Sequence, residues 1–177
     1  MTLNSFNAMR YVGPFRTEVT EKINQLSEVL DTIEQWLKVQ LLWENLVVVF
    51  TTGDIAKAMP LEAKVFREVD KAWAKIMENA NERKNVVICC QNDILKTSLP
   101  GNKDKLEQCQ KQLESYLEGK RAKFPRFYFT SPEDLLKILS QGSDIANVQD
   151  DFEKLFDAIN RVNTAEFNRK EISGICQ

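Results

Sequence analysis

The chain has 177 residues, about the length of one domain with a single core. Its 24 lysines and arginines against 26 aspartates and glutamates give a formal charge of -2, so no overall positive field favours nucleic acid or an anionic membrane. The absence of histidine excludes Ser-His-Asp and Cys-His catalytic sites and every imidazole metal site. With only six glycines and five prolines, long helices are favoured over a turn-rich β-sandwich.

A helix of about 35 residues is predicted from Pro14 to Phe50, because apolar residues recur there at helical spacing. One series, at spacings of seven residues or a multiple of seven, is Leu26, Ile33 and Val47, and a second, at seven, is Val29, Trp36, Trp43 and Phe50. At 1.5 Å per residue this helix is about 50 Å long, which favours an elongated bundle or part of a larger assembly. Trp36 and Trp43 share the spacing of the aliphatic residues, so we interpret them as core anchors rather than a ligand site.

The segment 51–54 is expected to end this helix, residues 55–59 form a short connector, and Pro60 suits the first position of the next helix. The expected apolar face of that helix runs to about Ala80 and consists of Phe66, Val69, Trp73, Ile76 and Met77. The polar residues 79–85 then predict a bend, and for the apolar segment 86–95 we favour a helix.

Residues 99–102, Leu-Pro-Gly-Asn, predict a turn, followed by a helix from Leu106 that ends at Gly119. The next run, 120–129, mixes basic and aromatic residues. Such a mixture is compatible with single-stranded nucleic-acid binding, but the charge balance favours a short buried strand or extended segment at 126–130.

Ser131 is expected to cap a helix that begins at Pro132 and ends at Gly142. A last helix is predicted over 145–162. Its acidic residues lack the spacing and the glycine of a calcium-binding loop, so we expect a solvated face; they are Asp150, Asp151, Glu153 and Asp157. The segment 165–177 is strand-like, with no later partner strand.

No catalytic or cofactor site is predicted. The chain contains no GxxxxGK[ST], GxGxxG or GxSxG motif, and no pair of carboxylates is singled out. We expect the thiols to be reduced and to fill small apolar spaces, because the cysteines do not form CxxC pairs and no secretory signal opens the chain. They are Cys89, Cys90, Cys109 and Cys176. Apolar runs such as 46–50 are far shorter than the roughly 20 residues of a membrane span.

Several motifs follow one another in an order that is informative in itself. They are Tyr-Val-Gly-Pro-Phe at 11–15, Ile-Glu-Gln-Trp-Leu-Lys-Val-Gln at 33–40, Gly-Asp-Ile at 53–55, Met-Pro at 59–60, Leu-Glu-Gln-Cys-Gln-Lys at 106–111, Tyr-Leu-Glu-Gly-Lys-Arg at 116–121, Phe-Pro-Arg-Phe-Tyr-Phe-Thr-Ser at 124–131 and Asp-Leu-Leu-Lys-Ile-Leu-Ser-Gln at 134–141. From Tyr11 to Gln177 the chain resembles the N-terminal linker region of dynein heavy chains, and the opening motif and tryptophan helix resemble the axonemal subclass. Thr130 and Gly119 depart from the family pattern, which puts local helix length in question.

The resemblance implies a mainly α fold: an elongated bundle of antiparallel helices with short extended or β segments near 124–130 and at the C-terminus. The implied domains are a lead-in at 1–13, a helical linker subdomain at 14–163 and a truncated strand-like segment at 164–177. The expected structural anchors are Trp36, Trp43, Trp73, Phe50 and Phe66, and the family-motif segment is Phe124, Pro125, Arg126, Phe127, Tyr128 and Phe129.

The implied function is a mechanical lever in microtubule-based movement of cilia or flagella. ATP and magnesium would be bound by the AAA+ ring of the parent heavy chain, so no cofactor, metal or catalytic residue is expected in this fragment. The implied partners are that ring and other dynein subunits, with microtubule contact through absent domains and none with nucleic acid or membrane. Compliant joints are expected at 53–54, 79–85 or 99–103. The alternative is a non-motor helical scaffold or adaptor that binds a protein partner.

Overall fold

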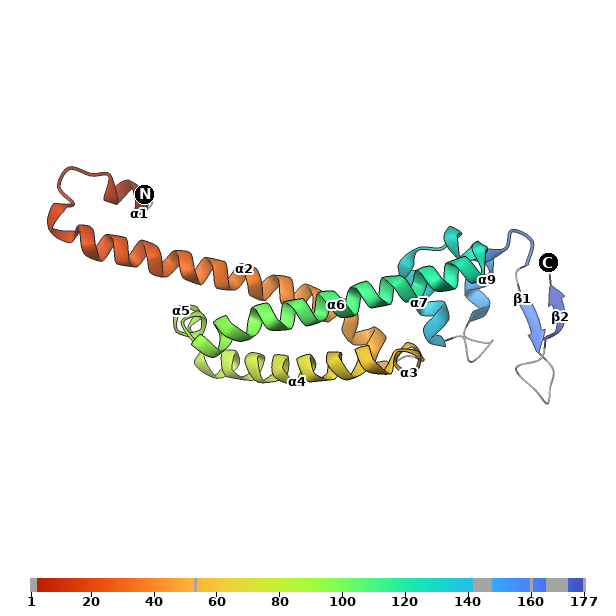
Figure 1. The fold of residues 1–177 in the computed structure, drawn as a ribbon. Helices are drawn as coiled ribbons and strands as arrows, with labels where there is room; N and C mark the ends of the chain where they lie inside the picture. The colour runs from red at the N-terminus through yellow and green to blue at the C-terminus, as the bar shows by residue number, and fades with distance from the viewer. Residues whose placement is uncertain (1–2, 53, 142–147, 160, 165–171, 177) are drawn as a thin grey trace. The chain divides into compact units, whose positions relative to one another are not determined.

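The structure, a computed structural model, describes residues 3–52, 54–141, 148–159, 161–164 and 172–176. The chain is mainly helical (Figure 1). Short helices α1 (Leu3–Asn7) and η1 (Gly13–Phe15) precede the long helix α2 (Arg16–Thr52); α3 (Ile55–Ala58) then connects it to α4 (Pro60–Arg83). No described helix has the length and apolar character needed to cross a membrane.

After α4 come α5 (Val86–Cys90), the long α6 (Asp93–Lys123), the 3-10 helix η2 (Pro125–Phe129) and α7 (Pro132–Gln141). The described chain ends with η3 (Gln149–Asp151), α9 (Phe152–Leu155), and strands β1 (Arg161–Thr164) and β2 (Ile172–Cys176). Two compact units make up the chain: residues 1–43 with 69–105, and residues 44–68 with 106–177. Each long helix contributes residues to both units.

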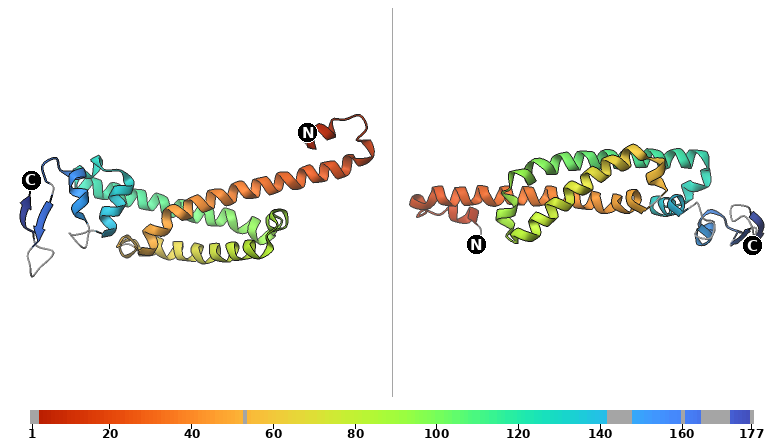
Figure 2. Two further views of the ribbon diagram at one scale, coloured as in Figure 1. Left: turned by 180° about the vertical axis from the view of Figure 1, so that it is seen from behind. Right: turned by 90° about the horizontal axis from the view of Figure 1, so that it is seen from below.

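In the first unit, α4 and α6 form an antiparallel helical hairpin that α5 closes, as two directions of view show (Figure 2). The hairpin turns where Lys84 adopts a left-handed φ of 52°. The Asn85 side chain then caps α5 by accepting a 3.1 Å hydrogen bond from the Ile88 N–H. The bend predicted over 79–85 is therefore confirmed only at residues 84–85, because α4 continues to Arg83. The helix predicted over 86–95 is interrupted between Cys90 and Asp93, where α5 ends and α6 begins.

The buried residues of the long helices alternate at spacings of three and four, as in coiled coils. On α2 the buried or half-buried residues that follow this spacing are Val29, Thr32, Trp36, Val39, Trp43, Leu46 and Phe50. On α6 the buried positions are Leu95, Leu99, Asn102, Leu106, Cys109, Leu113 and Leu117. The second predicted series of α2 lies in this seam, whereas Leu26 of the first series is 41% exposed.

Two predicted helix ends inside α6 are wrong. The expected turn at 99–102 is helical although it contains Pro100, and the helix passes Gly119 to end at Lys123. The buried positions of α6 lie on both sides of Pro100, so packing of this face outweighs the local preference for a turn. Gly119 is exposed, and a single exposed glycine costs only about 1 kcal/mol.

The predicted extended segment at 126–130 is also wrong, because residues 125–129 form the 3-10 helix η2, none of whose side chains is buried. Only the flanking Phe124 and Thr130 have extended backbone. The expected cap of the following helix is confirmed: Ser131 Oγ accepts a 3.1 Å hydrogen bond from the Asp134 N–H.

The helix predicted over 145–162 is confirmed only over residues 149–155, which form η3 and α9, and it is wrong beyond Leu155. Helix α9 ends at Leu155, where Phe156 becomes extended (φ -139°, ψ 126°), and Val162 lies in β1. Strand β1 pairs antiparallel with β2, with Val162 opposite Ile175, so the expected strand at the C-terminus has an earlier partner. The Gln149 side chain holds β1 by accepting from Val162 N–H at 3.0 Å and donating to its carbonyl at 2.7 Å. The predicted stop at Gly142 lies outside the described residues.

Candidate functional site

The first unit brings the three tryptophans together. Trp73 of α4 is 3% exposed, and its ring lies edge-on to Trp36 at 6.3 Å and tilted against Trp43 at 6.4 Å. Trp43 and Trp36 are both half-buried on α2. The Trp43 Nε1–H donates a 2.9 Å hydrogen bond to Asp70 Oδ1. The cluster is a packed helix contact in which the Trp43 indole N–H has a hydrogen-bond partner, so it has the features of a structural anchor.

The second unit contains a stacked pair of buried aromatic rings. Phe50 of α2 and Phe66 of α4 stack with centroids 5.5 Å apart and an interplanar angle of 25°. Phe66 is fully buried. Nearby, Cys109 Sγ lies 3.8 Å from the Glu62 carbonyl, and burial raises the pKa of this thiol. A raised pKa disfavours the thiolate, so Cys109 is a packing residue rather than a nucleophile.

The family-motif segment joins elements of the second unit. Phe124 lies 4.9 Å from Phe127 and 6.4 Å from Phe156, measured between ring centroids. Arg126 donates a 3.0 Å hydrogen bond from Nη1 to the Leu155 carbonyl at the end of α9. Its guanidinium carbon also lies 4.8 Å from the Phe156 ring centroid. Arg126 thus holds η2 against the C-terminal end of α9 through a carbonyl contact and a cation–π contact.

A second arginine fixes the other end of the segment. Arg121, in the last turns of α6, donates a 3.2 Å hydrogen bond to the Thr130 carbonyl and lies 5.9 Å from the Tyr128 ring. The Tyr128 hydroxyl donates to Glu118 at 2.5 Å, and this hydrogen bond raises the pKa of Tyr128. Arg121, Arg126 and Tyr128 of the basic and aromatic run are therefore committed to contacts within the chain.

An ionic cluster that sequence reasoning missed links α7 with η3 and α9. Asp151 is 1% exposed and lies 3.2 Å from Lys137 Nζ and 3.0 Å from Lys154 Nζ. Lys154 also pairs with Asp134 at 2.6 Å. The hydrogen bond to Lys154 lowers the pKa of Asp134 and raises that of Lys154. The prediction of a solvated face is wrong at Asp151, which is buried. In the sequence, only the three-residue spacing between Asp151 and Lys154 indicated that these two side chains form an ion pair.

Helix α2 also carries an apolar face that the first unit does not bury. At heptad spacing this face includes Val19, Ile23, Leu26, Leu30, Ile33 and Leu37, followed by Leu41. The four leucines are 41%, 55%, 62% and 61% exposed in chain order. Because leucines at this spacing form one stripe along a helix, α2 presents a second helix-packing surface.

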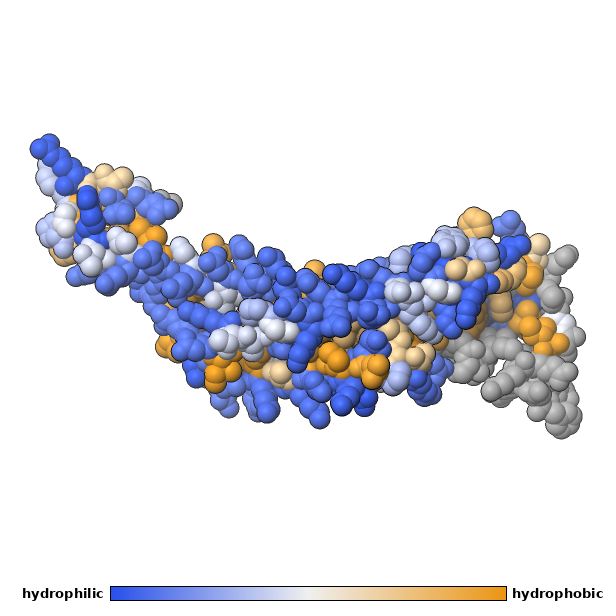
Figure 3. Space-filling view, in the orientation of Figure 1, coloured by the Kyte–Doolittle hydropathy of each residue, from blue (hydrophilic) through white to orange (hydrophobic). Residues whose placement is uncertain are grey.

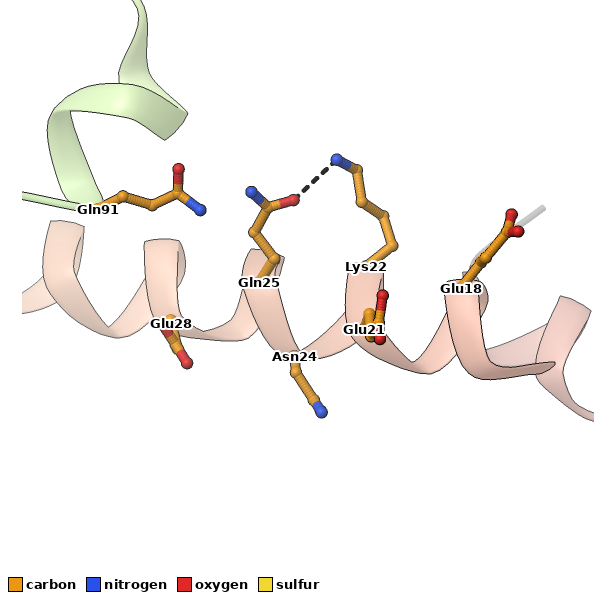
Figure 4. Close-up of a pocket in the computed structure, with 7 residues that line it drawn as sticks. All are labelled: Glu18, Glu21, Lys22, Asn24, Gln25, Glu28 and Gln91. Carbon is orange, nitrogen blue, oxygen red and sulfur yellow. Dashed lines mark hydrogen bonds between the residues drawn. The ribbon is translucent and has the colours of Figure 1, made fainter. Parts of the chain in front are cut away.

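Two hollows of the first unit differ in chemistry. The N-terminal hollow is lined by Phe6, Met9, Tyr11, Val12, Phe15 and Val19, and Figure 3 shows apolar atoms gathered over this end of the molecule. The other is polar and open, and Figure 4 shows Gln91 pointing along α2 toward Gln25, which accepts a 2.7 Å hydrogen bond from Lys22. Within the described ranges, no three acidic or cysteine side chains are grouped as a metal would require. Neither hollow presents a nucleophile beside a base.

The family model and the similar proteins found by comparison point to the same family. The family described as "Dynein heavy chain, N-terminal region 2" matches residues 1–177. The chain is 46% identical to human dynein axonemal heavy chain 8 over 92% of its length, and 47% identical to mouse dynein axonemal heavy chain 5 over 96%. It is 45% identical over 92% of its length to the dynein gamma chain of the flagellar outer arm from Chlamydomonas reinhardtii. It spans about 4% of the length of each of these relatives.

Proposed function

Because this chain belongs to the dynein heavy chain family, we propose that it forms part of the linker, the mechanical lever of the motor. Its relatives are axonemal, one of them from a flagellar outer arm, and its location is the ciliary or flagellar cytoskeleton. In this proposal, ATP hydrolysis in the AAA+ ring of the heavy chain drives the lever, which transmits displacement to the tail. ATP and magnesium belong to that ring, and this segment carries no catalytic residue.

The observation that carries the proposal is the regular packing seam of the long helices. A lever must resist bending along its length, and helices packed through interlocking side chains provide that stiffness. Within the two units, the tryptophan cluster and the Phe50–Phe66 stack are anchors of this kind. The contacts of Arg126 and Asp151 fasten the short C-terminal elements of the second unit to one another.

Energy transfer between two fluorophores in a complete axonemal heavy chain tests the proposal. One fluorophore replaces the exposed side chain of Lys123, and the other is placed on the ring. We expect the transfer efficiency to change between ATP-bound and nucleotide-free states. A heavy chain whose ring cannot bind ATP serves as the control. The same efficiency in every nucleotide state would contradict the lever function.

A second candidate function, a helical adaptor for a protein partner, is favoured by the exposed leucine stripe of α2. The double variant Leu30→Gln and Leu37→Gln removes two of its exposed leucines, and Glu34→Gln on the same helix is the control. An adaptor predicts that the double variant loses dynein subunits in co-sedimentation while the nucleotide-dependent energy transfer is kept. Intact subunit binding would reject this function.

A further inference from the structure

Helix α6 contains three successive residues that each weaken a helix, Pro100, Gly101 and Asn102. All three are helical in the structure, in the interior of a helix that continues to Lys123. Their local preference therefore opposes the conformation that packing imposes on them. Each residue weakens the helix by a different physical route.

Pro100 has no backbone N–H, so the Lys96 carbonyl lacks the donor four residues ahead that a regular helix provides. Gly101 increases the conformational freedom of the backbone, and no close neighbour requires a glycine at this position. A methyl group at Gly101 would meet no atom within 4 Å, and the residue is exposed. The first two residues thus remove one helical hydrogen bond and leave the adjoining backbone loosely constrained.

Asn102 occupies a position of the buried seam between Leu99 and Leu106. Its side chain is 7% exposed, and its Nδ2 has no hydrogen-bond partner. Burial of an amide donor without an acceptor is unfavourable, because the group loses its hydrogen bonds to water. Opening of the helix at this point would return the amide to water, so the seam itself is weakest where the backbone is weakest.

Residues 100–102 lie close to the point in the sequence of α6 where the first compact unit ends. The first compact unit takes α6 up to Lys105, and the second takes it from Leu106 onward. The three residues thus lie in the last turns that α6 contributes to the first unit. We propose that α6 opens locally at Pro100–Asn102 while its flanking turns stay folded, which makes this segment a built-in compliant joint. The opening is a property of the chain itself, and its use as a joint of a lever rests on the proposed function.

Amide hydrogen exchange at single-residue resolution on the 177-residue chain tests the opening. We expect the amides of residues 101–106 to exchange at least about tenfold faster than those of 109–117 in the same helix. The variants Gly101→Ala and Asn102→Leu, separately and combined, should slow exchange at 101–106. Using the single variants as well keeps the test valid if the larger leucine disturbs folding, which circular dichroism reports.

Gly119→Ala is the matched control, because Gly119 is also an exposed glycine of α6, and an added methyl group there would likewise meet no atom within 4 Å. It should leave exchange at 101–106 unchanged. Equal protection of 101–106 and 109–117 in the unaltered chain would overturn the proposal, as would equal slowing by Gly119→Ala.

The role in the lever has a separate test in the complete heavy chain. The combined Gly101→Ala and Asn102→Leu variant should reduce the change in energy transfer between nucleotide states, with ATP turnover retained. Slower exchange with an unaltered energy-transfer change would overturn the role as a lever joint while supporting the local opening. If the unaltered heavy chain shows no energy-transfer change at all, the proposed function fails, whatever the exchange result.

Discussion

The indole of Trp43 on α2 donates a 2.9 Å hydrogen bond to the carboxylate of Asp70 on α4, 27 residues away in sequence. Both residues lie in the first unit. The bond places a directional polar interaction in the seam, beside the buried Trp73. It therefore fixes which turn of α4 lies against which turn of α2, whereas apolar contacts alone are less selective of register.

Loss of this bond should be measurable as a coupling energy. Trp43→Phe and Asp70→Ala are each expected to destabilise the chain, and the double-mutant cycle should give a coupling of about 1–2 kcal/mol, because a hydrogen bond to a carboxylate is stronger than a neutral one. Urea unfolding followed by circular dichroism provides the free energies. Asp70→Asn retains an acceptor oxygen and should lose less than Asp70→Ala. A coupling of zero within error would show that the bond does not contribute.

The Phe50–Phe66 stack predicts a large loss of stability on truncation. Phe66→Ala removes a fully buried ring and should lower the free energy of unfolding by about 3–5 kcal/mol, because a cavity replaces the side chain. The matched control on the same helix is Leu61→Ala, whose side chain is 74% exposed and whose loss should cost no more than about 0.5 kcal/mol. Denaturant unfolding of both variants compares them directly. Similar losses for the two variants would contradict the burial of the Phe66 ring.

The contacts of Arg126 predict a local effect at the end of α9. Arg126→Ala removes the hydrogen bond to the Leu155 carbonyl and the contact with Phe156, and should cost about 1 kcal/mol. Arg126→Lys keeps the charge but loses the planar fork, so it should restore only part of the stability. Exchange rates of the amides at 152–156 should rise in the alanine variant. Lys123→Ala, at the end of α6, is the control and should leave those rates unchanged.

The pair Asp134–Lys154 predicts a dependence of stability on acid. The folded-state pKa of Asp134 is depressed below its ordinary value of 3.8, so the unfolded chain takes up this proton first as the pH falls. The stabilisation is present above pH 3.8 and is lost as the pH drops through the folded-state pKa.

Unfolding free energies measured between neutral and acid pH should therefore fall less steeply at low pH in Asp134→Asn than in the unaltered chain. Glu133→Gln, which changes the adjacent exposed carboxylate, is the control and should keep the steeper fall. Identical low-pH slopes for Asp134→Asn and the unaltered chain would reject the contribution of this pair.

The ionic cluster also makes Asp151 a sensitive position. Asp151→Asn removes a buried charge that faces two lysines, which are themselves 46% and 42% exposed. The lysines can turn to solvent, so we expect a loss of about 1–3 kcal/mol rather than collapse of the fold. Thermal unfolding checks the size of the loss. Glu153→Gln, a neighbouring exposed acid, should leave the melting temperature unaltered.

Residues that are close together in the chain are sufficient to predict several elements of this fold. Periodicity and groups within one helical turn predict the start of α4 at Pro60, the Ser131 cap and the long helix, whose predicted end at Phe50 lies two residues before its observed end at Thr52. The ordered motifs identified the family, because several separate motifs rarely occur in the same order by chance. Local preference and final structure agree in these segments.

Packing between elements sets the conformation of the segments whose local preference differs from the final structure. Residues 99–102 favour a turn, but the buried positions on both sides hold them in α6, and the aromatic run at 124–129 forms a 3-10 helix tied to α9 by Arg126. The sequence predicts that Asp151 is a solvated surface acid, whereas in the structure it is buried and paired with Lys137 and Lys154. The deciding free energy includes contacts between residues distant in the chain, such as Arg126 with Leu155 and Asp151 with Lys137, which spacing and composition do not encode locally.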